Sequence, residues 1–223
     1  MSRLVGLYEK WEKGRDSRFL GMIEHDQDAS VVDLGCGTGR FTLKVSERVG
    51  CGEIYGVDVW EEGLKEAKIK GVKTQRMDLN ERLNFPDKSF NVVVSNQVIE
   101  HLFFPSKFVQ EIHRILKKDG YMVMSTENLA SWDNIISLLF GYTPFSVEFD
   151  SIKIGNPFSP HNKEGRGNYP SHVRVFSYQG LIDLLEFHRF KTENISATGY
   201  LPFNFLANLN PRHARFIIVK ARK

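Results

Sequence analysis

Three glycines, each separated from the next by one residue, form the part of this sequence most suited to chemistry. Gly35, Gly37 and Gly39 follow an apolar run, and a helical pattern begins at Arg40. Glycine adopts backbone angles that other residues avoid, and it lets a ligand approach the main chain closely. The helix behind the turn offers unpaired N–H groups and the positive end of its dipole. The turn therefore predicts a site for a nucleotide-like ligand with an anionic group.

The positions of the glycines favour one kind of nucleotide over another. A dinucleotide fingerprint has glycine at its first, third and sixth places, whereas the sixth place here is Arg40. An NAD-dependent oxidoreductase is therefore the less favoured interpretation. Asp58 ends the next apolar run, where a carboxylate can accept hydrogen bonds from two ribose hydroxyls. Asp78 follows the expected third strand, and both acids have the alternative of serving only as a helix cap or a turn residue.

The elements that must position these residues follow a regular rhythm over residues 30–126, where apolar runs alternate with helical patterns. Residues 90–95 are nearly continuous β-branched sequence, which is typical of a strand covered on both faces. A helical pattern then begins at Pro105, and another apolar run follows at residues 121–125. This rhythm predicts the α/β class, with a parallel sheet between two layers of helices.

The length of 223 residues predicts one domain, which divides into four segments. A helical segment is expected over residues 1–28 and a cofactor-binding core over 30–126. Residues 127–175 are irregular and contain many prolines and glycines, which predicts an insertion or lid, with a short helix at 135–140. Residues 176–223 predict a helix followed by two strands.

Motifs in a fixed order give the sequence a resemblance to a known family. The segments that carry it are DLGCGTGRF, YGVDV, the MDL before FPDKSFNVVVSNQVIEHL, and EIHRILKKDGYMVMS. The sequence resembles the class I S-adenosylmethionine-dependent methyltransferases, and within them the type 11 group that includes the quinone-biosynthesis enzymes. The resemblance implies a Rossmann-like, doubly wound, three-layer αβα fold with a seven-stranded, mostly parallel sheet whose last strand is antiparallel. It also implies S-adenosyl-L-methionine as cofactor and S-adenosyl-L-homocysteine as product.

Each residue of the glycine turn has a role that the resemblance implies. The backbone around Gly35, Gly37 and Gly39, with Cys36 in the same turn, would line the methionine part of the cofactor. Asp33 would hold the cofactor's amino group through water. We interpret Cys36 as a small filler rather than a nucleophile, because a thiolate needs an electropositive neighbour.

The resemblance places the other cofactor residues after the second, third and fourth strands. Asp58 would bind the ribose hydroxyls, and Val59 and Leu79 would enclose the adenine ring. Asp78 would lie near the adenine amino group, and Asn96 beside the sulfonium.

Transfer of a methyl group from a sulfonium is an in-line displacement, so the enzyme chiefly aligns the acceptor and excludes water. A nitrogen or oxygen acceptor also needs a base to take its proton. Histidine titrates near neutral pH and often plays this part, so His101 and His172 are the candidate catalytic residues. An architectural role is the alternative for either. The other candidate bases are Glu127, Glu148, Asp150 and His161.

The expected acceptor is a small molecule, such as a lipid, a glycan or an aromatic compound. Aromatic residues in irregular segments can wall an apolar pocket, although core packing is the alternative. These residues are Trp11, Trp132, Phe140, Phe145 and Phe149, with the apolar stretch 200–209. The segment NQVI after the fourth strand lacks the prolines of the enzymes that methylate amino groups of nucleic acids. A protein methyltransferase and a non-catalytic cofactor-binding module stay open as alternatives.

Composition disfavours several further classes. The net charge of +3 is too small to indicate a nucleic-acid surface, and no apolar run reaches the ~18 residues of a membrane-spanning helix. The two cysteines, Cys36 and Cys51, cannot build a disulfide framework or a four-cysteine zinc site, and no metal is expected. We therefore expect a cytoplasmic protein, either a monomer or a homodimer.

Overall fold

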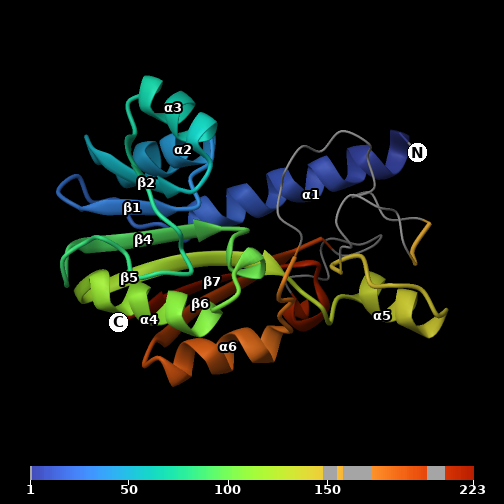
Figure 1. Cartoon of the computed structure of the whole chain (residues 1–223). Coiled ribbons are helices and arrows are strands. Elements are labelled where there is room, and N and C mark those ends of the chain that lie inside the picture. The colour runs from blue at the N-terminus through green and yellow to red at the C-terminus, as the bar shows by residue number, and fades with distance from the viewer. Residues whose placement is uncertain (1, 148–154, 158–171, 200–208) are drawn as a thin grey trace.

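The computed structural model describes residues 2–147, 155–157, 172–199 and 209–223 (Figure 1). Within these residues, seven strands form one sheet. They are β1 (Val31–Leu34), β2 (Ile54–Asp58), β3 (Lys73–Arg76), β4 (Phe90–Asn96), β5 (Leu116–Glu127), β6 (Lys191–Thr198) and β7 (Phe216–Arg222). The order across the sheet is β3-β2-β1-β4-β5-β7-β6. Strands β1 to β5 are parallel, and β7 pairs antiparallel with both β5 and β6.

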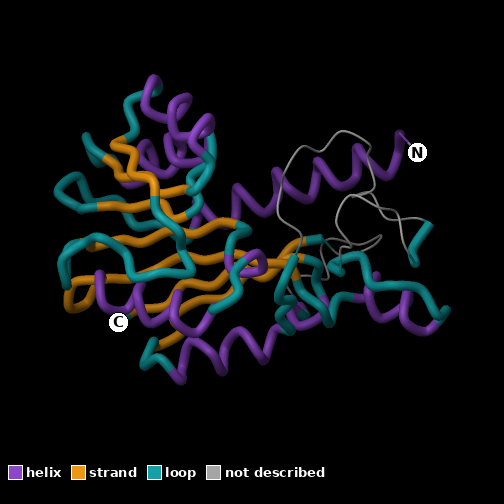
Figure 2. Tube along the Cα trace, viewed as in Figure 1, coloured by secondary structure: helices purple, strands orange, loops and turns teal. Residues whose placement is uncertain are grey.

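Helices connect the strands and cover both faces of the sheet (Figure 2). They are α1 (Ser2–Gly21), α2 (Arg40–Val49), α3 (Glu61–Ile69), η1 (Ile99–His101), α4 (Pro105–Ile115), α5 (Trp132–Leu139), α6 (Tyr178–Phe187) and η2 (Pro211–His213). None of these helices is both long enough and apolar enough to cross a membrane.

The central strands are buried on both faces because neighbouring side chains point into different cores. Val31 packs into the core under α1 and α2, whereas Val32 packs into the core under α4 and α6. Val92 and Val93 divide between the same two cores. Figure 1 shows α4 and α6 together on one side of the sheet, with α1 and α2 on the other. The predicted three-layer fold, with its antiparallel last strand, is therefore confirmed.

Several boundaries differ from the sequence-based prediction. The first helix ends at Gly21 rather than near residue 28. The strand expected at residues 121–125 begins already at Leu116, which pairs with Phe90 before the register shifts. The shift follows from a turn in which Asp119 has a φ of 63°. The short helix expected at 135–140 begins at Trp132, directly after its N-cap residue Ser131.

Candidate active site

The sheet order creates a crevice at the carboxyl ends of the central strands. The chain runs outward from β1 through β2 to β3 and then returns to β4 on the other side of β1. Ligands of doubly wound sheets bind outside the carboxyl ends at such a switch point. Gly35 follows β1, Asp58 ends β2 and Asn96 ends β4, so the topology brings these predicted cofactor residues to one edge.

The glycine turn has the left-handed backbone that its sequence predicts. The φ angles are 89° at Gly35, 50° at Gly37 and 75° at Gly39. A Cβ atom on Gly35 would lie 2.3 Å from Val98 Cγ2, and one on Gly39 would lie 2.9 Å from Ala67 Cβ. A Cβ atom on Gly37 would meet no described atom within 4 Å. Gly35 and Gly39 are therefore needed because a side chain there would collide with neighbouring residues, whereas Gly37 leaves its backbone open to a ligand.

This difference predicts separate effects on folding and binding for Gly37→Ala. A left-handed alanine costs about 1 kcal/mol, so the variant is expected to fold with a slightly lower free energy of unfolding. Its methyl group projects toward the proposed ligand, so the affinity for S-adenosylhomocysteine, measured by calorimetry, is expected to fall at least about tenfold, or ~1.4 kcal/mol. Gly71→Ala is the matched control, because Gly71 has a φ of 94° and equally open surroundings. Equal affinities for both variants would contradict contact between the cofactor and the turn.

Asp58 ties the glycine turn to the end of the neighbouring strand. Its Oδ2 atom accepts a hydrogen bond from Gly37 N–H at 2.8 Å, and its Oδ1 atom accepts one from Trp60 N–H at 2.9 Å. Val57 O accepts from the N–H groups of both Gly35 and Cys36. The contact with Trp60 lies just before α3, whose N-cap residue Trp60 has no side-chain capping hydrogen bond, so Asp58 does not cap this helix. The two contacts leave further lone pairs on both carboxylate oxygens for a ligand.

Asp33 is a buried carboxyl group beneath the turn. Burial raises its pKa to about 7, the hydroxyl of Thr42 opposes this rise, and the charge of Asp58 adds to it. The Thr42 hydroxyl donates to Asp33 Oδ2 at 2.6 Å. Sequence reasoning missed Thr42, although its place on the buried stripe of α2 was a signal, because a buried hydroxyl needs a partner.

Cys36 is buried in the same turn, between two acidic groups. Burial raises the pKa of its thiol above the ordinary value, and the charges of Asp33 and Asp58 raise it further. A thiol held neutral in this way is a poor nucleophile. The surroundings therefore favour the interpretation of Cys36 as a filler.

The residues expected around adenine lie at adjacent strand ends but differ in exposure. Val59 is 53% exposed, whereas Leu79 is buried in the core under α4. Asp78 is exposed, and its Oδ1 atom accepts hydrogen bonds from the backbone and the amide of Asn80 at 2.8 and 3.0 Å. Asp78 therefore acts as a turn residue, which was its alternative role, and its contact with adenine stays a prediction.

Asn96 is held in place at the end of β4 by a hydroxyl of β5. The Ser125 hydroxyl donates to Asn96 Oδ1 at 2.6 Å and accepts from Gln97 Nε2 at 3.2 Å. Gln97 has a φ of 59°, which turns the chain sharply into η1. Sequence reasoning missed Ser125 because its contact with Asn96 depends on strand pairing.

The two candidate catalytic histidines lie together. The ring centroids of His101 and His172 are 4.9 Å apart. His172 Nδ1 lies 2.9 Å from Ser146 O, and because a carbonyl only accepts, Nδ1 is the donor. The backbone carbonyl of Glu100 accepts from the N–H groups of residues 173 and 174, which brings the two segments into contact. The other candidates His161, Glu148 and Asp150 lie outside the described residues.

Glu100 belongs to the same cluster, and sequence reasoning missed it. Burial raises the pKa of this carboxyl to about 7, while the charge of His172 opposes the rise. The Thr126 hydroxyl donates to Glu100 Oε2 at 2.9 Å. The signal that could have revealed Glu100 was an acidic residue directly beside a candidate histidine at the carboxyl end of a strand.

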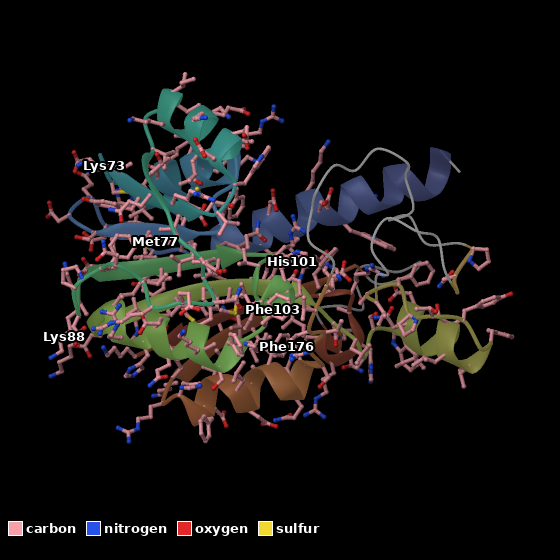
Figure 3. The ribbon with its side chains drawn as sticks, in the orientation of Figure 1. Lys73, Met77, Lys88, His101, Phe103 and Phe176 are labelled. Carbon is pink, nitrogen blue, oxygen red and sulfur yellow. The ribbon has the colours of Figure 1, made fainter. Side chains whose placement is uncertain are left out.

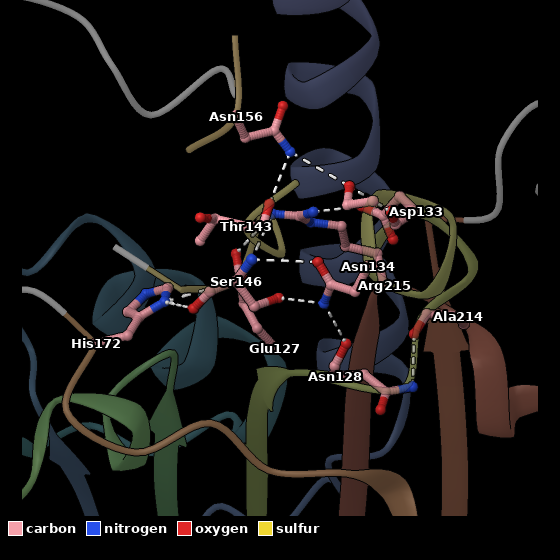
Figure 4. Close-up of polar contacts among 11 residues, drawn as sticks. Glu127, Asn128, Asp133, Asn134, Thr143, Ser146, Asn156, His172, Ala214 and Arg215 are labelled. Carbon is pink, nitrogen blue, oxygen red and sulfur yellow. Dashed lines mark hydrogen bonds and ion pairs between the residues drawn. The ribbon is translucent and has the colours of Figure 1, made fainter. Parts of the chain in front are cut away.

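Glu127, another predicted candidate base, is part of a buried ionic group around Arg215 (Figure 4), and its role as a base stays a prediction. Arg215 forms ion pairs with Asp133 and, at 3.3 Å, with Glu127. Figure 4 also shows Asn134 between Asn128 and Ser146; its amide donates to Asn128 O at 3.0 Å and to Ser146 Oγ at 2.8 Å. This polar network fixes α5 at the end of the sheet and positions the carbonyl that orients His172.

The aromatic residues expected to wall a pocket have different surroundings. Trp11 is buried, Phe140 is 74% exposed, and the ring of Phe145 lies 5.6 Å from the guanidinium carbon of Arg215. Trp132 packs against His213 with ring centroids 4.8 Å apart. Phe149 and residues 200–208 lie outside the described residues.

Sequence reasoning missed a hollow with a largely apolar lining. It has a volume of about 610 Å³ and lies between the start of α4 and α6. Phe103 and Phe176, both labelled in Figure 3 together with His101, line it. Phe103 follows His101 by two residues in the chain, whereas neither His101 nor His172 is among the residues that line the hollow.

Comparison with known proteins supports the predicted class. Residues 32–124 match the type 11 family described as a methyltransferase domain. A probable S-adenosylmethionine-dependent methyltransferase from Mycolicibacterium smegmatis is 32% identical over 183 residues, which cover 76% of this chain and 60% of the relative. A demethylmenaquinone methyltransferase from Listeria welshimeri is 26% identical over 147 residues, covering 61% of this chain and 60% of the relative. The crystal structure of an S-adenosylmethionine-dependent methyltransferase from Mesorhizobium loti matches with a TM-score of 0.65 at 21% identity, covering 93% and 96% of the two chains.

The chain has the fold of solved S-adenosylmethionine-dependent methyltransferases. Residues 32–124 match the type 11 methyltransferase domain, and the domain predicted from the sequence is confirmed over this region. The chain spans between 35% and 60% of the length of the curated relatives it matches. Their names therefore do not settle its own activity or acceptor.

Proposed function

We propose that this protein binds S-adenosyl-L-methionine at the glycine turn, transfers its methyl group to a small-molecule acceptor, and releases S-adenosyl-L-homocysteine. The observation that supports this most is the hydrogen bond from Gly37 N–H to Asp58. It holds an open stretch of backbone beside a carboxylate at the switch point of the sheet. That pairing suits a ligand that has a ribose next to a compact polar chain.

The described residues fit the proposed cofactor at both of its ends. Asp33 offers a carboxyl group to the cationic amino group, and Gly37 leaves space for the chain that carries it. Val59 offers an exposed apolar surface to the adenine ring. The complete proposed cofactor site comprises Asp33, Gly35, Cys36, Gly37, Gly39, Asp58, Val59, Asp78, Leu79 and Asn96.

The bound cofactor would supply a methyl group already activated on sulfur, so the protein has chiefly to align the partners. Asn96, fixed by Ser125, lies where β4 meets the proposed position of the sulfur. His172 donates through Nδ1 to Ser146 O, so the Nε2 atom of the neutral ring carries a lone pair that can accept a proton from the acceptor. His101 packs against this ring and helps to position it.

The raised pKa of Asp33 predicts that cofactor binding depends on pH. The carboxyl group has a pKa of about 7 in the free protein, and a nearby ammonium group favours its charged form. Binding then releases a proton, so the affinity for S-adenosylhomocysteine is expected to rise as the pH increases toward about 7 and to level off above it. Calorimetry in buffers of different ionisation enthalpy measures this proton directly. Asp33→Asn is expected to bind more weakly and without the pH dependence, and a pH dependence that persists in this variant would contradict the assignment.

The hollow between the start of α4 and α6 supports an apolar or aromatic acceptor. Phe103 and Phe176 line it and offer aromatic surfaces, and Phe103 follows His101 by two residues in the chain. One relative is named a demethylmenaquinone methyltransferase, and we propose a quinone-like compound as one candidate class of acceptor for this chain. The expected insertion or lid at residues 127–175 includes residues 148–154 and 158–171, which lie outside the described residues, so its part in acceptor binding stays a prediction.

Incubation with S-adenosylmethionine that carries a labelled methyl group, together with fractionated cell extract, tests the proposal. Label is expected in a small-molecule fraction, with stoichiometric formation of S-adenosylhomocysteine. If the label appears in a protein fraction instead, the acceptor is a protein and the small-molecule proposal is wrong. Binding without transfer to any fraction would indicate a non-catalytic module, and calorimetric binding of NAD in place of S-adenosylhomocysteine would indicate an oxidoreductase. A cytoplasmic location, and a monomeric or homodimeric state, remain predictions from the sequence.

A further inference from the structure

Three potential metal ligands converge just beyond the end of β4. One ligand atom each from Glu100, His101 and His172 lies within 4.8 Å of the ligand atoms of the other two side chains. They come from η1 and from the segment that begins at His172, which hydrogen bonds join at the Glu100 carbonyl. We propose that these three side chains bind a divalent transition-metal ion.

The tautomer of His172 suits metal binding. Nδ1 donates to Ser146 O at 2.9 Å, so the neutral ring presents the lone pair of Nε2 on its other side. Metal-binding histidines nearly always donate their second ring N–H to a carbonyl or carboxylate, which fixes the orientation of the ring. The Oε2 atom of Glu127 also lies 4.0 Å from His172 Nδ1 and adds negative charge behind the ring. His172 thus already has the outer hydrogen bond that a metal ligand requires.

The carboxylate of Glu100 supplies an independent indication. Glu100 is completely buried, and its Oε2 atom accepts from the Thr126 hydroxyl. Its Oε1 atom is also buried, and no described residue donates a hydrogen bond to it. Burying a carboxylate oxygen without a partner is unfavourable. A cation held with His101 and His172 would provide that partner.

The donor set indicates the kind of ion. Two imidazole nitrogens and one carboxylate oxygen are typical of zinc or iron(II), whereas calcium and magnesium prefer oxygen ligands alone. Three protein ligands leave at least one coordination position open. If the proposed function holds, an ion on His172 Nε2 would occupy the lone pair that otherwise accepts the acceptor's proton. In the metal-bound state, an acceptor hydroxyl at the open position would instead lose its proton more easily because the ion polarises it. The metal site itself rests only on the three side chains, so it can be tested without cofactor or acceptor.

The test is titration of the chelator-treated full chain with Zn²⁺ alone, followed by calorimetry. We expect one ion per chain, and Glu100→Gln and His172→Gln are each expected to weaken binding at least about tenfold, or ~1.4 kcal/mol. His25→Ala is the matched control, because His25 is exposed and precedes β1 at the opposite edge of the sheet. Equal affinity in all variants, or no binding by the unmodified chain, would overturn the proposal.

X-ray absorption at the zinc edge tests the same site without any substitution. The zinc-loaded, unmodified chain is expected to show two imidazole ligands and no sulfur ligand. Fewer imidazoles, or coordination by sulfur, would place the ion elsewhere and overturn the assignment. If the chain binds no metal, the proposals for cofactor binding and methyl transfer still stand. If it binds no cofactor, the metal proposal still stands, so each proposal can be refuted without the other.

Discussion

Asp58→Ala is expected to weaken the binding of S-adenosylhomocysteine by roughly 100-fold or more. Each hydrogen bond to a charged group contributes about 1.5–3 kcal/mol, and the proposed ribose contact contains two of them. The substitution also releases Gly37 N–H, which Asp58 Oδ2 holds at 2.8 Å, so the turn loses its fixed position. Calorimetric titration of the unmodified and variant chains with S-adenosylhomocysteine measures the difference.

Two further variants separate ribose binding from local stability. Asp58→Asn keeps one oxygen that can accept from Gly37 or Trp60, so it is expected to bind with intermediate affinity. Asp183→Ala removes an exposed carboxylate from α6 and is expected to bind as the unmodified chain does. If Asp58→Ala remains folded, as judged by urea unfolding, and binds with unchanged affinity, the role of Asp58 in the cofactor site is wrong.

Arg215→Met is expected to lower the free energy of unfolding by about 3–5 kcal/mol, because removal of one member of a buried ionic group leaves the other charges uncompensated. Arg215 is among the largest completely buried side chains, and it pairs with the buried carboxylates of Glu127 and Asp133. Methionine fills much of the same volume but cannot neutralise these carboxylates. Urea unfolding at neutral pH measures the loss.

Charge-neutral partners should restore part of this stability. Adding Glu127→Gln and Asp133→Asn to Arg215→Met removes both uncompensated charges, so the triple variant is expected to be more stable than Arg215→Met alone. Arg212→Met changes a neighbouring but exposed arginine and is expected to alter stability by less than about 0.5 kcal/mol. A loss in Arg212→Met as large as that in Arg215→Met would show that buried charge is not the cause.

The sequence predicts the cofactor half of the fold well because its signals are local. The glycine turn, the β-branched strand β4 and the alternation of strands with helices each depend on a few neighbouring residues. The order of the strands was not predicted and comes from the strand pairing in the structure. The end of α1 at Gly21 and the early start of β5 at Leu116 were missed, since turns and strand pairing set these boundaries.

The acceptor side depends on contacts between distant segments, and the sequence did not reveal them. Glu100 meets Thr126 through the pairing of β4 and β5, and it meets His172 through a segment more than 70 residues away. Helix α5 buries Asp133 and Asn134 and exposes Leu139, the reverse of the usual pattern. This reversed pattern is stable because Asp133 forms an ion pair with Arg215 and Asn134 donates a hydrogen bond to Ser146. Both partners lie far from α5 or outside it in the sequence, so a local sequence pattern cannot predict them.

A crystal structure of the full chain with S-adenosylhomocysteine tests the central claim most directly. The ribose hydroxyls are expected within hydrogen-bonding distance of Asp58, with the homocysteine chain along Gly35 and Gly37 and its amino group toward Asp33. Electron density for the nucleoside at any other place would contradict this binding site. The absence of ligand density at a saturating concentration of S-adenosylhomocysteine would contradict it as well.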